Sequence, residues 1–263
     1  MINNKTDAAD ACAICEVVRR PNTSFVQIKT VEQQQITALH RVRERLIRNR
    51  TALVNQIRGL LYEDGIIIQQ GITFLRREFP EILCENDYRL SCASKILYGN
   101  LYEELCIVDD RIAILEKQLQ QMARTNENCT RLLKVPGIGL LTATALVAHI
   151  GDAKQFKNSR QFSACLGLTP KEYSSGGKQK LLGISKRGNS YLRKLLIQGA
   201  RILCTWWNRK TPQKGEWRKL WLQQITERRG KFVAAVAQAN KTARIVWHIL
   251  AKGEEYQSNI VIV

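Results

Sequence analysis

The sequence predicts a mainly α-helical protein, in which a long pair of coiled-coil helices is followed by a basic helical domain. Two observations support this fold class. Apolar residues recur at alternating spacings of three and four over residues 39–60 and 101–122, as in a coiled-coil seam. After residue 126, helix-like segments alternate with short turns, and few segments show the period-two alternation of strands. The composition, with 44% hydrophobic and 24% charged residues, excludes wholesale disorder.

The two coiled-coil segments differ in regularity. Asn49 and Gln56 break the first seam, whereas the second seam is unbroken. The apolar positions are Leu39, Val42, Leu46, Leu53 and Leu60 in the first segment and Leu101, Leu105, Val108, Ile112, Leu115, Leu119 and Met122 in the second. Gly71, Pro80 and Gly99 punctuate the chain between them. The helices can therefore pair antiparallel within one chain or pair between subunits, and we expect a homo-oligomer.

The outer face of the first helix is rich in arginine. The run consists of Arg41, Arg43, Arg45, Arg48 and Arg50, with Glu44 as the only acidic residue among them. A solvated helix face and a nucleic-acid contact are both consistent with this pattern. Arg41, Arg45 and Arg48 are therefore candidate nucleic-acid contacts.

A domain boundary is expected at residues 126–130, where a polar stretch precedes a new apolar segment. Helices are predicted at 140–149, 159–167, 189–203 and 231–250, with a polar loop at 169–183 and a Trp-rich segment at 206–221. The expected organisation is thus an N-terminal segment at 1–32, a helical linker at 33–125 and a C-terminal domain at 126–263.

Positive charge is concentrated in the C-terminal half. Residues 1–125 carry a net charge of +1, and residues 126–263 carry +17 of the total of +18. This balance indicates a polyanionic partner, with nucleic acid as the first candidate, and places the phosphate-binding surface after residue 126.

The remaining composition points to a soluble, cytoplasmic protein with no membrane partner. The longest apolar stretch, 140–150, is too short to span a bilayer. Eight cysteines are scattered through helix-like sequence, which favours reduced thiols over a disulfide framework. Cys12 and Cys15 form a lone C-x-x-C, and the three histidines do not supply the two further ligands of a zinc site.

Two segments after residue 126 indicate phosphate chemistry. Pro136-Gly137-Ile138-Gly139 lies between two helix-like segments and is similar to a helix-hairpin-helix turn, whose backbone N–H groups approach phosphates; an ordinary tight turn is the alternative. Lys134, Gly137 and Gly139 are therefore candidate nucleic-acid contacts.

The second segment is the polar loop that contains Ser174, Ser175, Gly176 and Gly177. Most such loops are merely flexible. Here the serines lie among cations that could stabilise the charge that develops when a hydroxyl attacks a phosphodiester: Lys178, Lys180, Lys186, Arg187, Arg193 and Lys194.

The order of motifs between residues 135 and 196 resembles a known family. The motifs are P-G-I-G, A-x-I-G-D, R-Q-F, L-G-L-T-P, S-G, G-I-S-K-x-G-N and L-R-x-L-L. They resemble the C-terminal domain of insertion-sequence transposases of the "one-ten" family, also called one-sixteen or nine-oh-two. Residues 39–61 also resemble the stretch that those proteins place between their two domains, so the resemblance spans nearly the whole chain.

This resemblance implies a DNA transposase or recombinase that acts on DNA, with a guide RNA supplied by the element. It implies that Ser175 is the nucleophile, with Ser174 as the alternative. It also implies a ribonuclease-H-like domain with four acidic residues that ends in D-x-x-D-A, which Asp7 and Asp10 match. Two aspartates at i and i+3 share a helix face and could ligate Mg²⁺.

The first two acidic residues of that domain are expected upstream of Asp7. We therefore expect only a remnant of the ribonuclease-H-like domain and an N-terminally truncated, impaired transposase. The rival hypotheses are a non-catalytic DNA- or RNA-binding protein, and a helix-hairpin-helix repair protein, which leaves the other motifs unexplained.

Overall fold

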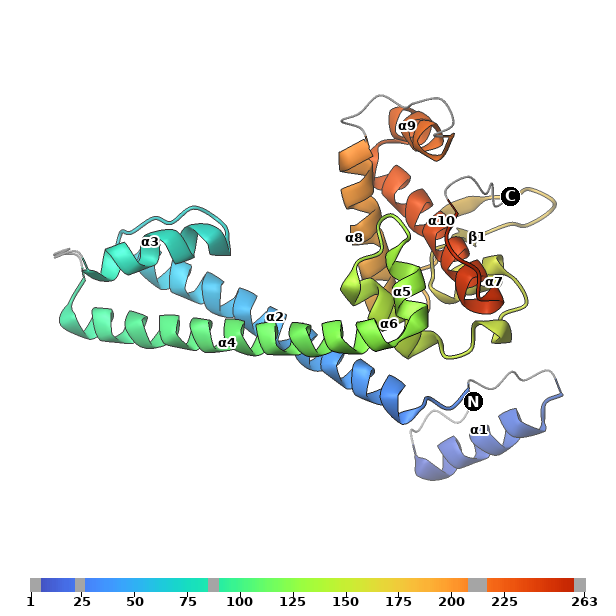
Figure 1. The fold of residues 1–263 in the computed structure, drawn as a ribbon, viewed down its shortest axis with the longest axis horizontal. Coiled ribbons are helices and arrows are strands. Elements are labelled where there is room, and N and C mark those ends of the chain that lie inside the picture. Colours follow the sequence, from blue (N-terminus) through green and yellow to red (C-terminus); the bar gives the residue numbers. More distant parts are fainter. Residues whose placement is uncertain (1–5, 22–26, 85–89, 208–216, 258–263) are drawn as a thin grey trace.

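The computed structural model describes residues 6–21, 27–84, 90–207 and 217–257. These residues form a long helical arm that projects from a C-terminal helical body (Figure 1). The arm consists of α2 (Val31–Glu63), α3 (Ile72–Cys84) and α4 (Cys92–Thr125). The body consists of α5 (Glu127–Leu133), α6 (Leu140–Ile150), the 3-10 helix η1 (Ala153–Gln155), α7 (Ser159–Cys165), β1 (Pro170–Glu172), β2 (Leu181–Ile184), α8 (Ser190–Trp207), α9 (Trp217–Arg229) and α10 (Lys231–Lys252).

The arm is built from α2 and α4, which run antiparallel and cross along their length (Figure 1). Thr30 and Gln33 form a capping box that starts α2, and the Ser91 hydroxyl caps α4. The helix α3 packs against the far end of the pair, where it contributes Leu75 and Phe79 to a small core. The pairing expected from the heptads therefore forms within one chain.

The side chains between α2 and α4 match the unbroken seam better than the broken one. Each of the seven apolar positions predicted on α4 is buried or half-buried. On α2, Val42 is 40% exposed, and Asn49 and Gln56 are exposed as well. The position of Val42 in the seam was thus a wrong prediction, because Arg43 and Arg50 of α2 face α4 instead and pair with carboxylates there.

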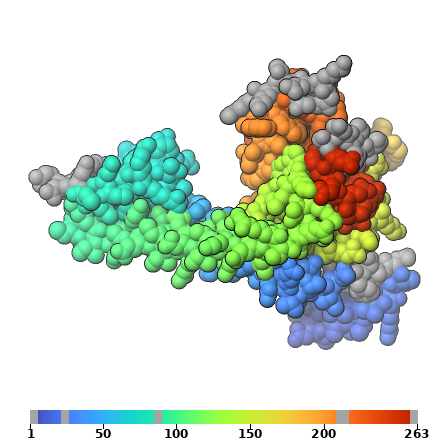
Figure 2. Space-filling model, in the orientation of Figure 1, coloured from blue at the N-terminus to red at the C-terminus, as the bar shows by residue number. Residues whose placement is uncertain are grey.

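The body has its own core around α6, α8 and α10. Eight of the eleven residues of α6 are buried, since α2, α4, α5 and α8 all pack against this helix. The last helix, α10, packs along α8 and also contacts α7 and α9. Figure 2 shows the resulting shape, a compact body with the arm extending from it.

The polar loop predicted at 169–183 is a β-hairpin. Strands β1 and β2 pair antiparallel, with Pro170 opposite Ile184 and Glu172 opposite Leu181. These strands were not predicted because all the side chains of β1 and most of those of β2 are exposed, so no apolar alternation marks them in the sequence.

The N-terminal helix α1 (Asp7–Arg19) stands apart from the arm and from the body core. None of its residues is buried. It lies beside the N-terminal end of α2, at the lower edge of the molecule in Figure 1.

The fold is mainly helical, as predicted. The helices α3 and α9 were not predicted, because Gly, Pro and Trp residues obscure their periodicity. No helix within the described ranges is both long enough and apolar enough to cross a membrane. All eight cysteines are free thiols.

Candidate functional site

Ser175 lies at the tip of the β1–β2 hairpin. Gly176 and Gly177 have φ values of 56° and 75°, so the tip is a type I′ turn, which needs positive φ at both central residues. The turn is closed by a hydrogen bond of 3.1 Å that the Lys178 N–H donates to the Ser175 carbonyl. The Ser175 side chain is exposed and, among the residues that the structure describes, its hydroxyl has no hydrogen-bond partner.

Ser174 has a different environment. Its hydroxyl donates to the Glu172 carboxylate at 2.7 Å and accepts from the Lys180 N–H at 3.2 Å. These bonds tie Ser174 to both strands of the hairpin. Of the two serines, Ser175 is therefore the one whose hydroxyl is open to a substrate, and Ser174 maintains the hairpin.

The base of the hairpin is locked to the body by close backbone contact. A Cβ atom at Gly188 would lie 1.8 Å from the carbonyl oxygen of Cys165, and one at Gly167 would lie 2.1 Å from that of Arg187. Arg193 reinforces the junction, because its guanidinium donates to the carbonyl oxygens of Leu166 and Arg187 at 3.1 and 3.0 Å. Arg193 thus acts here as an internal clamp.

Other predicted cations surround the hairpin. Lys178, Lys180, Lys186 and Arg187 are all exposed, and within the described ranges none of their side chains forms an ion pair. Lys186 has a φ of 55°, a conformation that is uncommon for residues other than glycine. The hairpin and its base therefore present positive charge that the protein itself leaves unneutralised.

The Pro136–Gly139 segment is a turn between α5 and α6, and it packs against α8. A Cβ atom at Gly137 would lie 2.6 Å from the Leu203 side chain, and one at Gly199 would lie 2.0 Å from the Gly137 carbonyl. This contact explains Gly137 without a ligand. Gly139 is exposed and caps α6, and Lys134 pairs with Glu255.

The predicted arginines of the arm divide into two groups. Arg43 and Arg50 pair with Glu116 and Asp109 on α4. The three candidates Arg41, Arg45 and Arg48 are exposed, and Arg48 lies 3.6 Å from Glu44. Glu44 also accepts a bond of 3.4 Å from Lys194 of α8, which links the arm to the body.

Asp7 and Asp10 lie in the first turn of α1 and are exposed. Carboxylates at this position stabilise a helix through its dipole, whatever else they do. Within the part of the chain that the structure describes, no group of three or more His, Cys, Asp or Glu residues could hold a metal ion. In Figure 1, α1 is also separated from the hairpin that carries Ser175. The two aspartates do not by themselves fit a Mg²⁺ site.

A buried histidine joins the arm to the body. His40 of α2 is 1% exposed, and its ring nitrogens bond to the hydroxyls of Tyr191 on α8, at 2.9 Å, and Thr144 on α6, at 3.0 Å. Because Thr144 donates its own proton to the Leu140 carbonyl, it accepts from Nε2 of His40. Burial, aided by the nearby His149 and Arg43, lowers the pKa of His40 to about 4.

Sequence reasoning missed a lysine in the body. Lys241 of α10 lies over the rings of Trp217 and Trp221, with Nζ 4.0 and 4.5 Å from the ring centroids. Burial, together with Arg218 and Arg244, lowers the pKa of Lys241 to about 8. The Trp-rich segment was the only signal in the sequence for this arrangement.

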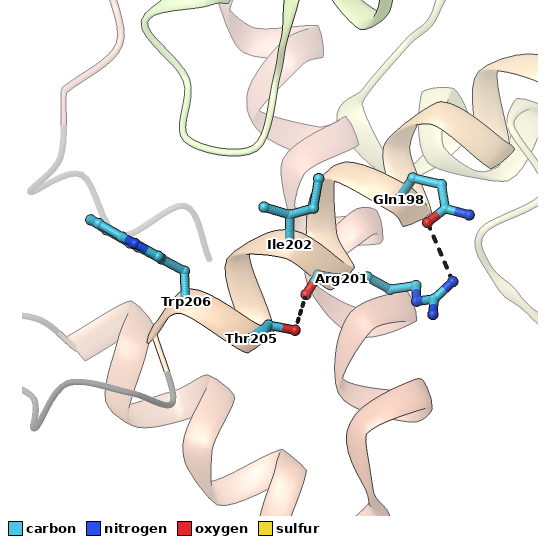
Figure 3. Close-up of a pocket in the computed structure, with 5 residues that line it drawn as sticks. All are labelled: Gln198, Arg201, Ile202, Thr205 and Trp206. Atoms are coloured by element: carbon cyan, nitrogen blue, oxygen red, sulfur yellow. Dashed lines mark hydrogen bonds between the residues drawn. The ribbon is translucent and has the colours of Figure 1, made fainter. Parts of the chain in front are cut away.

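The exposed face of α8 forms a shallow groove of about 380 Å³ (Figure 3). Arg201 bonds to Gln198 at 3.3 Å, and Thr205 donates to the Arg201 carbonyl at 3.0 Å. Ile202 and Trp206 are 70% and 55% exposed. The described residues that line the groove all come from α8, and none of them is a predicted site residue.

Two family profiles match the chain. The profile described as "Transposase IS116/IS110/IS902 family" matches residues 129–215, which contain the α5–α6 turn, the hairpin and α8. A second transposase profile, that of the DEDD domain, matches residues 2–63, which contain α1 and α2.

Curated relatives match over almost the whole chain. The transposase for insertion sequence element IS1111A of Coxiella burnetii is 46% identical over 97% of this chain and 69% of its own length. A probable family 20 transposase of Pseudomonas aeruginosa is 44% identical over 97% of this chain and 74% of its length. The transposase for element IS1328 of Yersinia enterocolitica is 39% identical over 95% and 73%. The chain therefore belongs to the IS116/IS110/IS902 family of insertion-sequence transposases.

Proposed function

We propose that this chain binds DNA and exchanges DNA strands through Ser175. The observation that carries the proposal is the hairpin tip, where an exposed, unbonded hydroxyl lies on a rigid type I′ turn among unneutralised lysines. The family to which the chain belongs supports DNA as the substrate.

The chemical step is attack of the Ser175 Oγ on a phosphorus atom of the DNA backbone. A bond forms between Oγ and phosphorus, the bond to one bridging oxygen of the phosphodiester breaks, and that oxygen leaves as a DNA hydroxyl after it takes up a proton. Lys178 and Lys180 would stabilise the charge on the non-bridging oxygens. Rejoining reverses the step with a new DNA hydroxyl.

The hydroxyl proton of Ser175 needs an acceptor beyond the hairpin. Glu172 already accepts from Ser174, which shares its side of the strand. Asp7 and Asp10, the carboxylates that the DEDD resemblance points to, lie on α1, and they do not fit a metal site on their own. We assign no step to Mg²⁺ and leave these aspartates as candidate carboxylates of a larger acidic site.

Further parts of the proposal rest on the resemblance and on charge. An RNA supplied by the element would guide the choice of DNA. The α5–α6 turn, with Gly139, would contact the phosphate backbone as helix-hairpin-helix turns do, and Lys134 would join this contact by exchanging Glu255 for a phosphate. The exposed Arg41, Arg45 and Arg48 would extend this contact onto the arm, and the α2–α4 coiled coil would support a homo-oligomer.

The test is a covalent protein–DNA adduct on a denaturing gel, using the 263-residue chain with DNA that carries the ends of its element and the element's RNA. We expect at most a weak adduct with the unaltered chain, because Asp7 and Asp10 do not form a metal site on their own, and none with Ser175→Ala. Ser174→Ala should reduce the adduct by loosening the hairpin but should not abolish it.

Two outcomes would contradict this assignment. An adduct that persists in Ser175→Ala and disappears in Ser174→Ala would move the nucleophile by one residue. DNA binding without an adduct in any variant would instead favour a non-catalytic nucleic-acid-binding protein.

A further inference from the structure

A cleft of about 690 Å³ lies between the hairpin and α10, next to the proposed serine site. Its volume is in the range of clefts that hold small organic ligands. One wall is formed by the hairpin and the other by α10, with Trp221 of α9 between them. The lining residues include Pro170 and Leu182 of the hairpin, Trp221, and Phe232, Lys241 and Arg244 of α10.

The cleft walls are largely apolar and remain open to solvent. Phe232 is 76% exposed, Val233 is 50% exposed and Leu182 is 47% exposed. Exposed apolar side chains that cluster around one cleft are typical of a binding site. The aromatic ring of Trp221 adds a second flat surface.

Among the described residues that line the cleft, two are cations, Lys241 and Arg244, and none is a carboxylate. Lys241 is held against the rings of Trp217 and Trp221, so its charge has a fixed position. Arg244 lies beside it, within 3.4 Å of the Ser159 hydroxyl. The Asn240 side-chain amide donates hydrogen bonds of 3.0 Å to the Ser163 hydroxyl and to the Leu168 carbonyl oxygen. These bonds fix the wall of the cleft at the base of the hairpin.

Aromatic rings combined with fixed cations are typical of sites that bind unpaired nucleic acid. The bases stack on the rings, and the cations neutralise the phosphates. A purely apolar ligand would leave the charge of Lys241 without a counterpart in the ligand, and the net charge of +17 over residues 126–263 favours a polyanion.

The cleft is within reach of Ser175 along the same DNA strand. Pro170 in the cleft wall and Ser175 are five residues apart along the hairpin, which is at most about 17 Å for extended chain. Stacked DNA rises about 3.4 Å per nucleotide, so this separation covers about five nucleotides.

We propose that the cleft between the hairpin and α10 binds an unpaired base of the DNA strand that is attacked at the hairpin tip. This proposal rests on the proposed function for DNA as the ligand and for attack at the hairpin tip. The cleft would hold the strand unpaired within about five nucleotides of the scissile phosphate.

The experiment measures binding of the 263-residue chain to a short single-stranded DNA that contains the fluorescent base 2-aminopurine. Stacking on an aromatic ring quenches this base. We expect quenching on binding, and we expect Phe232→Ala, which leaves Trp221 as the second ring, to reduce the quenching and to weaken single-strand affinity about 5- to 100-fold. The matched control is Tyr62→Ala, an aromatic residue of the arm that is 68% exposed, and it should change neither quantity.

A second variant tests the cationic side. Lys241→Gln should weaken single-strand binding and lower its dependence on salt, whereas Lys117→Gln on the exposed face of the arm should not. Affinity for blunt double-stranded DNA should change less than single-strand affinity in both cleft variants.

Several results would overturn the proposal. One is an equal loss of affinity for single- and double-stranded DNA in Phe232→Ala. A second is unchanged quenching in that variant. A third is binding of RNA or of an acidic peptide, but not of DNA, that depends on Phe232. These assays do not depend on strand exchange, so Ser175→Ala should bind and quench normally. Intact quenching without any adduct in the unaltered chain would count against strand exchange through Ser175 and leave the cleft proposal standing.

Discussion

The arm and the hairpin both carry many cations, and they use them differently. In the arm, Arg43 and Arg50 of α2 pair with Glu116 and Asp109 of α4, and Arg76 of α3 also pairs with Asp109. Around the hairpin, within the described ranges, Lys178, Lys180, Lys186 and Arg187 form no ion pair. The two regions show that the number of positive residues does not locate a nucleic-acid surface.

Partners within the fold make the difference. An arginine run on a helix can be neutralised by a neighbouring helix, and this consumes the charge that a phosphate would need. A short hairpin with exposed strands has no such neighbour. Loss of a carboxylate opposite the arm should therefore affect stability, and loss of a lysine at the hairpin should affect binding.

The largest expected effect is on stability. It distinguishes the tightly packed base of the hairpin from its exposed strands. In Gly188→Ala the new Cβ would collide with the Cys165 carbonyl at a φ of 79°, so the body should lose about 4 kcal/mol of stability or fail to fold. Gly183→Ala, where nothing lies within 4 Å, should be close to neutral. Chemical denaturation followed by circular dichroism measures both. Equal stabilities would show that the hairpin base is not locked.

The next effect lies in the arm. Ile112 is 4% exposed between α4 and α2, and Ile114 is 58% exposed on the same helix. Ile112→Asp should bury an unpaired carboxylate and cost about 3 kcal/mol, while Ile114→Asp should cost less than about 0.5 kcal/mol. Thermal unfolding of the two variants gives the comparison. Similar melting temperatures would contradict the packing of α2 on α4.

The sequence predicted the elements that have strong periodicity. The α4 seam is unbroken in the sequence and buried throughout, and α6, α8 and α10 begin within about one residue of their expected starts. The hairpin was not predicted, because its strands have no buried face. The Val42 position failed because a heptad grid cannot show that Arg43 finds a carboxylate 73 residues away.

The candidate site was predictable as a list of residues but not as a set of roles. The resemblance favours Ser175 over Ser174 as the nucleophile, and the bond from Ser174 to Glu172 adds a structural difference between the two serines. The sequence predicts Arg193 as a phosphate contact, whereas in the structure its guanidinium donates to two backbone carbonyl oxygens. Lys241 carries no motif at all, since its environment comes from α9, whose rings pack against α10 in three dimensions.

A pH titration tests the junction between the two regions. His40 has a pKa of about 4 in the folded protein and an ordinary value of 6.5, so the unfolded chain takes up a proton first as the pH falls. The stability that neutral His40 contributes is complete above about pH 6.5 and is lost as the pH falls towards 4, by about 3 kcal/mol. His40→Gln should be less stable at pH 7 and should show a flatter curve between pH 6.5 and 4. Curves of equal slope would exclude His40 as the source. His149, whose pKa is also lowered, remains in both proteins.

The smallest effect is on the salt dependence of DNA binding, and it sharpens the contrast between the two regions most directly. Each lysine that contacts a DNA phosphate releases counterions, so its removal should reduce the slope of log affinity against log salt by about 0.9. We expect Lys178→Gln combined with Lys180→Gln to reduce the slope by about 1.8 and to leave the unfolding transition unchanged, since both side chains are exposed and unpaired among the described residues. Arg43→Gln should do the reverse, because it removes the partner of Glu116 and contributes no free charge to DNA. The measurement is fluorescence anisotropy of labelled DNA at a series of salt concentrations, with chemical denaturation of each variant in parallel. A larger slope change for Arg43→Gln than for the lysine pair would reverse the assignment and place the DNA on the arm.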